Sequence, residues 1–171
     1  MKRSAGILPF KIENGRLMVF LEHPGGPFWK GIDKWSISKG EYKNEKAIDA
    51  AIREFKEESG FVVDKDELIY LGANKQKSKK LVNCFIINKD FDATNIKSNT
   101  FKKEWPVGSG VIQEFPEMDE ARWFLLDEAK EKIFQGQIVF LNKLVSKSIK
   151  LSILNIYKIK FVKYNVIVER R

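Results

Sequence analysis

The first third of the chain alternates short apolar runs with turn residues. Residues 4–12 and 17–23 are apolar runs of strand length, and Asn14-Gly15 between them is a dipeptide that favours a tight two-residue turn. This pattern predicts a β-hairpin. Residues 23–29, which read HPGGPFW, hold too much proline and glycine for regular structure and predict a loop.

Residues 44–59 change to a helical period. Apolar side chains recur there at spacings of three and four: Ile48, Ala51, Ile52 and Phe55. Asn44 is a suitable N-cap, and Gly60 is placed to end the helix, since glycine readily adopts the left-handed conformation found at helix C-termini. The sequence therefore predicts one amphipathic helix over this segment.

The rest of the chain carries further strand and helix patterns. Strands are predicted at residues 67–71, 81–87 and 122–125. From residue 88 to about residue 119 no regular period is visible, and this stretch is predicted to be irregular. Asp127 is expected to cap a helix that ends before Gly136. A second helical stripe follows: Ile138, Leu141, Leu144 and Val145.

The composition limits the kinds of active site that the chain can form. The chain has 171 residues, enough for a single domain with a sizeable core, and its only histidine and only cysteine are His23 and Cys84. A zinc site of His and Cys is thereby nearly excluded, and a nucleophilic hydrolase has one histidine to use, so carboxylate chemistry remains. One cysteine cannot form an intramolecular disulfide, and the apolar runs are too short for a membrane span or a signal peptide, so a cytoplasmic protein is expected.

The net charge of +8 is concentrated at the C-terminal end. Residues 147–171 carry seven Lys or Arg and one Glu, whereas residues 1–146 carry 24 basic and 22 acidic residues. We predict a domain over residues 1–146 and a basic extension over 147–171, which an added strand or an amphipathic surface segment would explain equally well. A near-neutral body with a basic end does not favour nucleic acid as the main partner.

Three acids stand close together on the predicted helix. Glu54, Glu57 and Glu58 occupy one arc, and like charges at these spacings destabilise an isolated helix by about 0.2–0.5 kcal/mol per pair. A solvated acidic face relieved by Lys46 and Lys56 is one explanation. The other is a divalent cation.

The flanking residues favour the cation. Gly40 precedes the helix, and Arg53 lies four positions before Glu57, where a guanidinium can orient a carboxylate. Oxygen ligands on a rigid helix, with a loop carbonyl nearby, suit Mg²⁺ or Mn²⁺.

Residues 40–61, which read GEYKNEKAIDAAIREFKEESGF, resemble the Nudix box of the Nudix hydrolases. The core REFKEESGF matches the family pattern, and Glu45 lies at the expected distance before Arg53. Only four residues separate Gly40 from Glu45 where the family has five, which indicates a one-residue deletion in the loop. Residues 2–146 are also similar to a bacterial subgroup of predicted NTP pyrophosphohydrolases, in which proline is usual at the position of Ser38.

The resemblance implies an α/β fold, the α/β/α sandwich with a mixed β-sheet, and metal-dependent hydrolysis of a nucleoside diphosphate linked to another group. It implies that Glu54 and Glu57 are catalytic, that the cation is held by carboxylates and the Gly40 carbonyl, and that Glu45 and Arg53 form a structural pair. The implied metal ligands are Gly40, Glu54, Glu57 and Glu58.

A further base or ligand is expected from a loop outside the box. Glu114 is the first candidate, because Glu114-Phe115-Pro116-Glu117 resembles a segment of dinucleoside tetraphosphatases, and Glu117 is the second. For either acid, a solvated loop residue is the alternative.

The expected substrate is a small nucleotide, a dinucleoside polyphosphate such as diadenosine tetraphosphate. Lys39 is expected to bind phosphate and His23 to line the site, although a solvated lysine and a structural histidine are the alternatives. Two other functions stay open, hydrolysis of the 5′ triphosphate of RNA and a non-catalytic Nudix-fold module that binds nucleotide or RNA. The sequence does not fix the oligomeric state.

Overall fold

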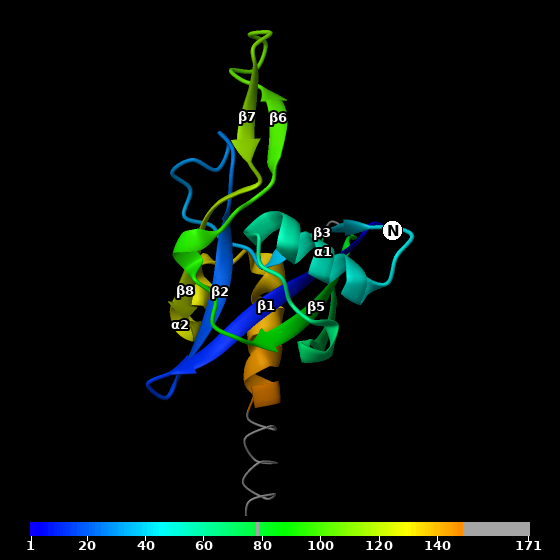
Figure 1. Cartoon of the computed structure of the whole chain (residues 1–171), viewed down its shortest axis with the longest axis vertical. Helices are drawn as coiled ribbons and strands as arrows, with labels where there is room; N and C mark the ends of the chain where they lie inside the picture. The colour runs from blue at the N-terminus through cyan, green and yellow to red at the C-terminus, as the bar shows by residue number, and fades with distance from the viewer. Residues whose placement is uncertain (78, 149–171) are drawn as a thin grey trace, which may run out of the picture.

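The computed structural model describes residues 1–77 and 79–148 (Figure 1). Within them the main element is a six-stranded mixed sheet in the order β4-β5-β1-β2-β8, with β3 paired to β1. β1 and β5 run parallel and the other neighbours are antiparallel. Its strands are β1 (Arg3–Glu13), β2 (Arg16–Pro24), β3 (Ser38–Tyr42), β4 (Ile69–Lys75), β5 (Leu81–Asn88) and β8 (Met118–Leu125).

The predicted hairpin is confirmed as β1 and β2. Asn14 and Gly15 at its turn have φ of 51° and 73°. Two consecutive positive φ values are what a two-residue turn needs to match the twist of the strands it joins.

Helices cover both faces of the sheet. Strand side chains alternate between these faces, so each strand contributes to two cores. Along β2, Val19 and Leu21 enter one core with α2 (Leu126–Lys132) and the helical residues 138–148. Phe20 enters the other core with Phe55 of α1 (Ala47–Ser59). The α/β/α sandwich with a mixed sheet is therefore confirmed.

The two predicted N-caps are wrong. α1 begins at Ala47 after Lys46, which makes no side-chain cap, and Asn44 lies outside the helix. α2 follows Leu125, with Asp127 in its first turn. The predicted C-terminal stop is confirmed, since Gly60 has φ of 82° and donates its N–H to the Lys56 carbonyl.

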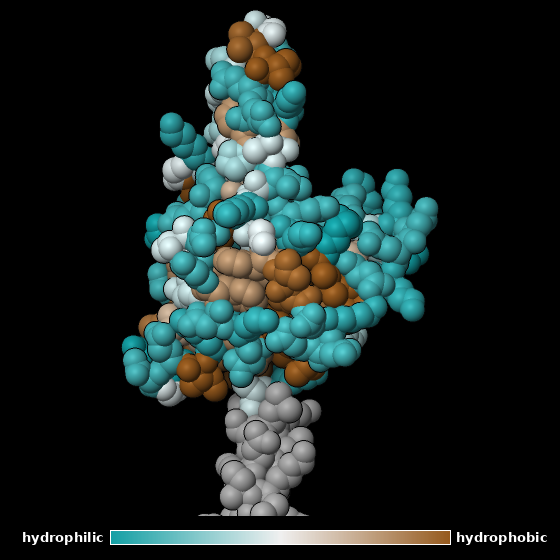
Figure 2. All heavy atoms as spheres, viewed as in Figure 1, coloured by the Kyte–Doolittle hydropathy of each residue, from teal (hydrophilic) through white to brown (hydrophobic). Residues whose placement is uncertain are grey.

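The stretch predicted to be irregular contains a second, two-stranded sheet. β6 (Thr100–Glu104) pairs with β7 (Ile112–Pro116), and this hairpin projects away from the sandwich (Figure 1). Val107, Val111 and Ile112 are exposed, and Figure 2 shows apolar side chains gathered at the tip. Short 3-10 turns complete the described elements: η1 (Lys65–Glu67), η2 (Ala93–Asn95) and η3 (Gln135–Gln137).

The C-terminal end of the described chain is helical through residue 148. Lys147 donates from its Nζ to the Tyr70 carbonyl at 2.9 Å. Residues 149–171, most of the predicted extension, lie outside the described residues, so the division at residue 146 stays a prediction. Among the helices of residues 1–77 and 79–148, none is long and apolar enough to cross a membrane.

Candidate active site

Arg53 holds three carboxylates around one guanidinium. Its Nη2 lies 2.8 Å from Glu45 Oε1, and its Nη1 lies 2.7 Å from Glu54 Oε1 and 3.0 Å from Glu57 Oε2. The hydrogen bond to Glu45 is the main cause of a raised pKa for Arg53. The predicted Glu45–Arg53 pair is thus present, and its cation offsets the repulsion within the acidic arc.

Glu54 reaches back from α1 to β3. A β-carbon built at Gly40 would overlap its carboxylate, so only glycine leaves room for the acid at this strand. The shorter loop therefore does not separate Gly40 from α1. Burial raises the pKa of Glu54, although Arg53 opposes the shift.

Glu58 is buried and turned toward β3. Its Oε2 accepts hydrogen bonds from Ser38 Oγ at 2.8 Å and from the Lys39 backbone N–H at 2.6 Å. Burial raises the pKa of Glu58 to about 7 despite these donors. Ser38 thus supplies one of the donors that hold this acid.

Glu22 is an acid that the sequence analysis did not select. It lies on β2 and is completely buried, and neither carboxylate oxygen has a hydrogen-bond partner among the described residues. Burial, followed by the charge of Glu58, raises the pKa of Glu22 well above its ordinary value. The available signal was one acid at the end of the run Val-Phe-Leu-Glu, in which the three preceding residues are core.

Of the two loop candidates, Glu117 stands beside the box. Burial and the charge of Glu57 raise the pKa of Glu117. Its backbone N–H donates to the Asn99 carbonyl at 2.8 Å, and the Asn99 N–H donates to the Glu57 carbonyl at 2.8 Å. Glu114 instead lies exposed on β7, where its carboxylate accepts a hydrogen bond from Thr100.

Lys39, the residue before the box, lines a cavity of about 620 Å³ to which no residue of the box itself contributes. Other cationic side chains that line it are Lys75, Lys77 and Lys80, and Phe134 adds an aromatic wall. This combination of cations and one aromatic ring suits a phosphate chain with a base attached.

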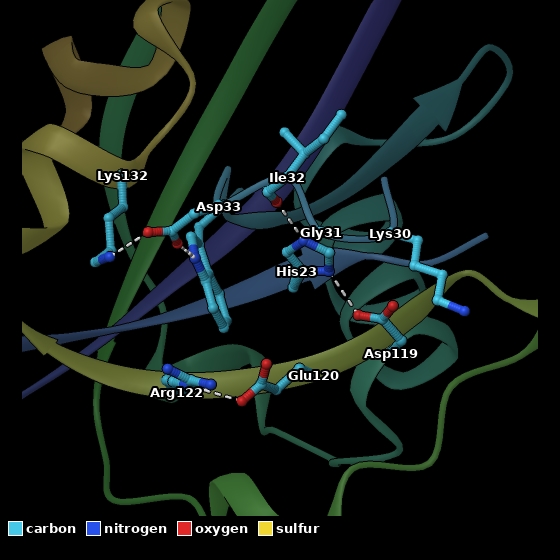
Figure 3. Close-up of a pocket in the computed structure, with 10 residues that line it drawn as sticks. His23, Lys30, Gly31, Ile32, Asp33, Asp119, Glu120, Arg122 and Lys132 are labelled. Carbon is cyan, nitrogen blue, oxygen red and sulfur yellow. Dashed lines mark hydrogen bonds and ion pairs between the residues drawn. The ribbon is translucent and has the colours of Figure 1, made fainter. Parts of the chain in front are cut away.

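His23 lines a different cavity, of about 570 Å³ (Figure 3). Figure 3 shows its ring between two acceptors, Asp119 Oδ1 at 2.6 Å from Nδ1 and the Ile32 carbonyl at 2.7 Å from Nε2. Burial lowers the pKa of His23, but the hydrogen bonds to Ile32 and Asp119 outweigh it and the net shift is upward. The structure thus does not bring His23 and Lys39 into one cavity.

The carboxylates of Glu54, Glu57 and Glu58 accept hydrogen bonds from protein donors. Within residues 1–77 and 79–148, no three His, Cys, Asp or Glu side chains are arranged to hold a metal ion as they stand. Two observations nevertheless fit a hard divalent cation at this place, the carboxylate of Glu54 against the bare backbone of Gly40 and the unpartnered oxygens of buried Glu22.

The comparisons with known proteins agree with this architecture. The family model described as NUDIX domain matches residues 1–144. No curated protein sequence matches the chain.

Three solved structures illustrate the shared fold. A C. elegans Ap4A hydrolase in a binary complex has 20% identity and a TM-score of 0.58, covering 88% of this chain and 99% of that chain. The NUDIX domain of Shewanella oneidensis NrtR with ADP ribose has 12% identity and a TM-score of 0.57, covering 85% and 86%. The M. smegmatis Nudix hydrolase RenU has 16% identity and a TM-score of 0.55, covering 86% and 85%.

Proposed function

Because the chain belongs to the Nudix family, we propose that it is a metal-dependent pyrophosphohydrolase of dinucleoside polyphosphates such as diadenosine tetraphosphate. The observation that carries the proposal is the set of α1 carboxylates that Arg53 and β3 hold together. The cation would be Mg²⁺ or Mn²⁺, held by Glu54, Glu57, Glu58 and the Gly40 carbonyl. When bound, it would neutralise phosphate charge and lower the pKa of the attacking water.

Arg53 has a positioning role in this proposal. It orients Glu54 and Glu57 through one nitrogen and is itself held by Glu45 through another. A guanidinium with fixed donor directions can preset two acids, which a flexible ammonium cannot do.

Glu117 is the proposed general base, in preference to Glu114. A carboxylate that takes a proton from water works best when its pKa lies above the ordinary value and closer to the working pH. Burial and Glu57 raise the pKa of Glu117, whereas Glu114 is exposed and hydrogen-bonded within the projecting hairpin. Glu57 connects this base to the rest of the box.

The cavity beside Lys39 supports the proposed substrate class. Lys39, Lys75 and Lys77 can balance a chain of phosphates, whereas Lys80 is already paired with Glu41 at 2.9 Å. Phe134 offers a face for a base. The fold likeness to an Ap4A hydrolase supports the same class. The cavity's positive charge also favours the 5′ triphosphate of RNA, which is the second candidate substrate.

Product analysis tests the proposal. The full-length protein is incubated with diadenosine tetraphosphate or a 5′-triphosphorylated oligonucleotide, in Mg²⁺, in Mn²⁺ or in EDTA. We expect metal-dependent cleavage of the dinucleotide, and the product pair AMP and ATP, or two ADP, locates the attacked bond. Preferred release of pyrophosphate from the oligonucleotide would favour the RNA function.

The matched variants are Glu57→Gln and Glu131→Gln. Glu131 is an exposed acid of α2 outside the box, so its variant should retain activity. Unchanged turnover in Glu57→Gln would contradict the site assignment. Nucleotide binding with no product from any substrate would instead support the non-catalytic module.

A further inference from the structure

Glu22 lies on the side of the sheet that α1 covers. Its register partner in β8 is Ala121, which belongs to the core beneath α1, and partners in register place their side chains on the same face. The Glu22 backbone is fixed by two hydrogen bonds of 2.9 Å with Ser36. The carboxylate is therefore held inside the molecule by the strand that carries it.

The surroundings of Glu22 belong to the proposed cation site. The charge of Glu58 helps to raise the pKa of Glu22, while Ser38 and Lys39 oppose the shift. These are the same two residues that donate hydrogen bonds to Glu58. Glu22 thus adjoins Glu58 from the sheet, whereas the other acids of the box come from the helix.

The two buried acids differ in how they are satisfied. Glu58 accepts two hydrogen bonds, but Glu22 accepts none among the described residues. A buried carboxylate without a partner is strongly unfavourable, and an apolar side chain of similar size would suit the position better. Ser38 and Lys39 offset the burial of Glu22 only in part, and a positive charge at the box would add to their effect.

We propose that Glu22 is an additional carboxylate of the divalent-cation site, contributed by β2 behind Glu58. Its unpartnered, fully buried oxygens at the side of Glu58 carry this proposal. The inference rests on the metal dependence proposed above. It adds a residue outside the box to the groups that hold the cation.

Mn²⁺ binding to the full-length protein, without nucleotide, tests the inference. The electron paramagnetic resonance signal of free Mn²⁺ gives the affinity directly and does not depend on turnover. Groups that support metal ligands typically change affinity 10- to 100-fold when removed. We therefore expect Glu22→Gln to weaken Mn²⁺ binding by about tenfold or more, and Glu131→Gln to leave it unchanged.

Thermal melting in EDTA and in MnCl₂ separates metal binding from folding. Without metal, Glu22→Gln should melt at or above the wild-type temperature, because it replaces a buried acid that lacks a hydrogen-bond partner with an uncharged side chain of the same shape. With metal, the wild-type protein should gain more than the variant. If Glu22→Gln does not fold, Glu22→Leu, which removes the acid without adding another polar atom, replaces it in both measurements.

The outcomes are distinguishable. Equal Mn²⁺ affinity and an equal metal-induced rise in melting temperature for wild type and Glu22→Gln would overturn the role of Glu22 alone. In that case, loss of binding in Glu58→Gln would leave the metal-dependent function standing. No Mn²⁺ binding by the wild-type protein would overturn both proposals.

Discussion

The carboxylate of Glu54 lies against the backbone of Gly40, in the space that a β-carbon at residue 40 would fill. This contact joins α1 to β3 across a loop that is one residue shorter than the family pattern. Gly40 is itself in register with Ala5 of β1, so the sheet fixes one side of the contact and the helix fixes the other. The position of Glu54 thus depends on the absence of a side chain on the strand.

Gly40→Ala should displace Glu54. The added methyl group would overlap the carboxylate, which lies at the end of a flexible side chain and can move away by giving up its contact with Arg53, at a cost of about 0.2–1 kcal/mol of unfolding free energy. Misplacement of a catalytic group by an ångström can cost about 100-fold in rate. We expect losses of this size in urea denaturation and in kcat.

The control is the same Gly40→Ala substitution made in a Glu54→Ala protein. If the clash is the cause, Gly40→Ala should cost little stability in a protein that already lacks the Glu54 carboxylate. An equal loss in both backgrounds would attribute the effect to the strand backbone instead.

Glu117→Gln and Glu114→Gln form a matched pair. Removal of a general base typically lowers the rate by about 100-fold or more, and burial and the charge of Glu57 raise the pKa of Glu117. We expect kcat to fall in Glu117→Gln and to stay near the wild-type value in Glu114→Gln. The reverse result would return the role to Glu114.

His23 should make stability depend on pH. Its folded pKa is raised above the unfolded value of about 6.5, so the charged ring stabilises the fold fully below that value. This contribution is lost as the pH rises through the higher, folded pKa. Asp119→Asn, which weakens the pair, should therefore cost more unfolding free energy at pH 5.5 than at pH 8.5.

Urea denaturation at both pH values measures this difference. Glu120→Gln is the control, because Glu120 faces His23 across β2 and β8 and makes the last and smallest contribution to its pKa. An equal cost of Asp119→Asn at the two pH values would show that the His23 ring does not change its charge between them.

Cys84 should be unreactive in the folded protein. The thiol is fully buried, and burial raises its pKa far above the ordinary value, so the nucleophilic thiolate is scarce. A disulfide reagent should label the denatured protein rapidly and the native protein only at the rate of unfolding. Immediate native labelling at pH 8 would contradict the buried position.

The local parts of the fold were predictable from the sequence. The β1–β2 hairpin follows from a turn dipeptide between apolar runs, and α1 follows from its apolar stripe and Gly60. The strand expected over residues 67–71 is displaced, since η1 (Lys65–Glu67) precedes β4 (Ile69–Lys75). Helix starts were harder to predict, because neither α1 nor α2 uses a side-chain cap.

The β6–β7 hairpin could not be recognised from apolar alternation. Its strands mostly do not enter the core, so polar residues such as Lys102 and Glu114 lie opposite each other in register. Backbone pairing alone leaves little trace in the pattern of apolar residues.

The residues of the candidate site also differ in how far the sequence could predict them. Arg53 and the acids of α1 are near one another in sequence, so spacing alone brings them together. Glu22 and Ser38 meet the box only through strand pairing, which no local pattern reveals.

The projecting hairpin enters and leaves the domain at neighbouring points. Asn99 precedes β6 and Glu117 follows β7, and their backbones are hydrogen-bonded to each other, while Asn99 also anchors to the Glu57 carbonyl. Residues 100–116 therefore form a projecting segment whose two ends are held together by backbone hydrogen bonds. Its length and tip can diverge among related chains while the spacing of Glu117 from α1 is preserved, so this segment is free to specialise without disturbing the acids.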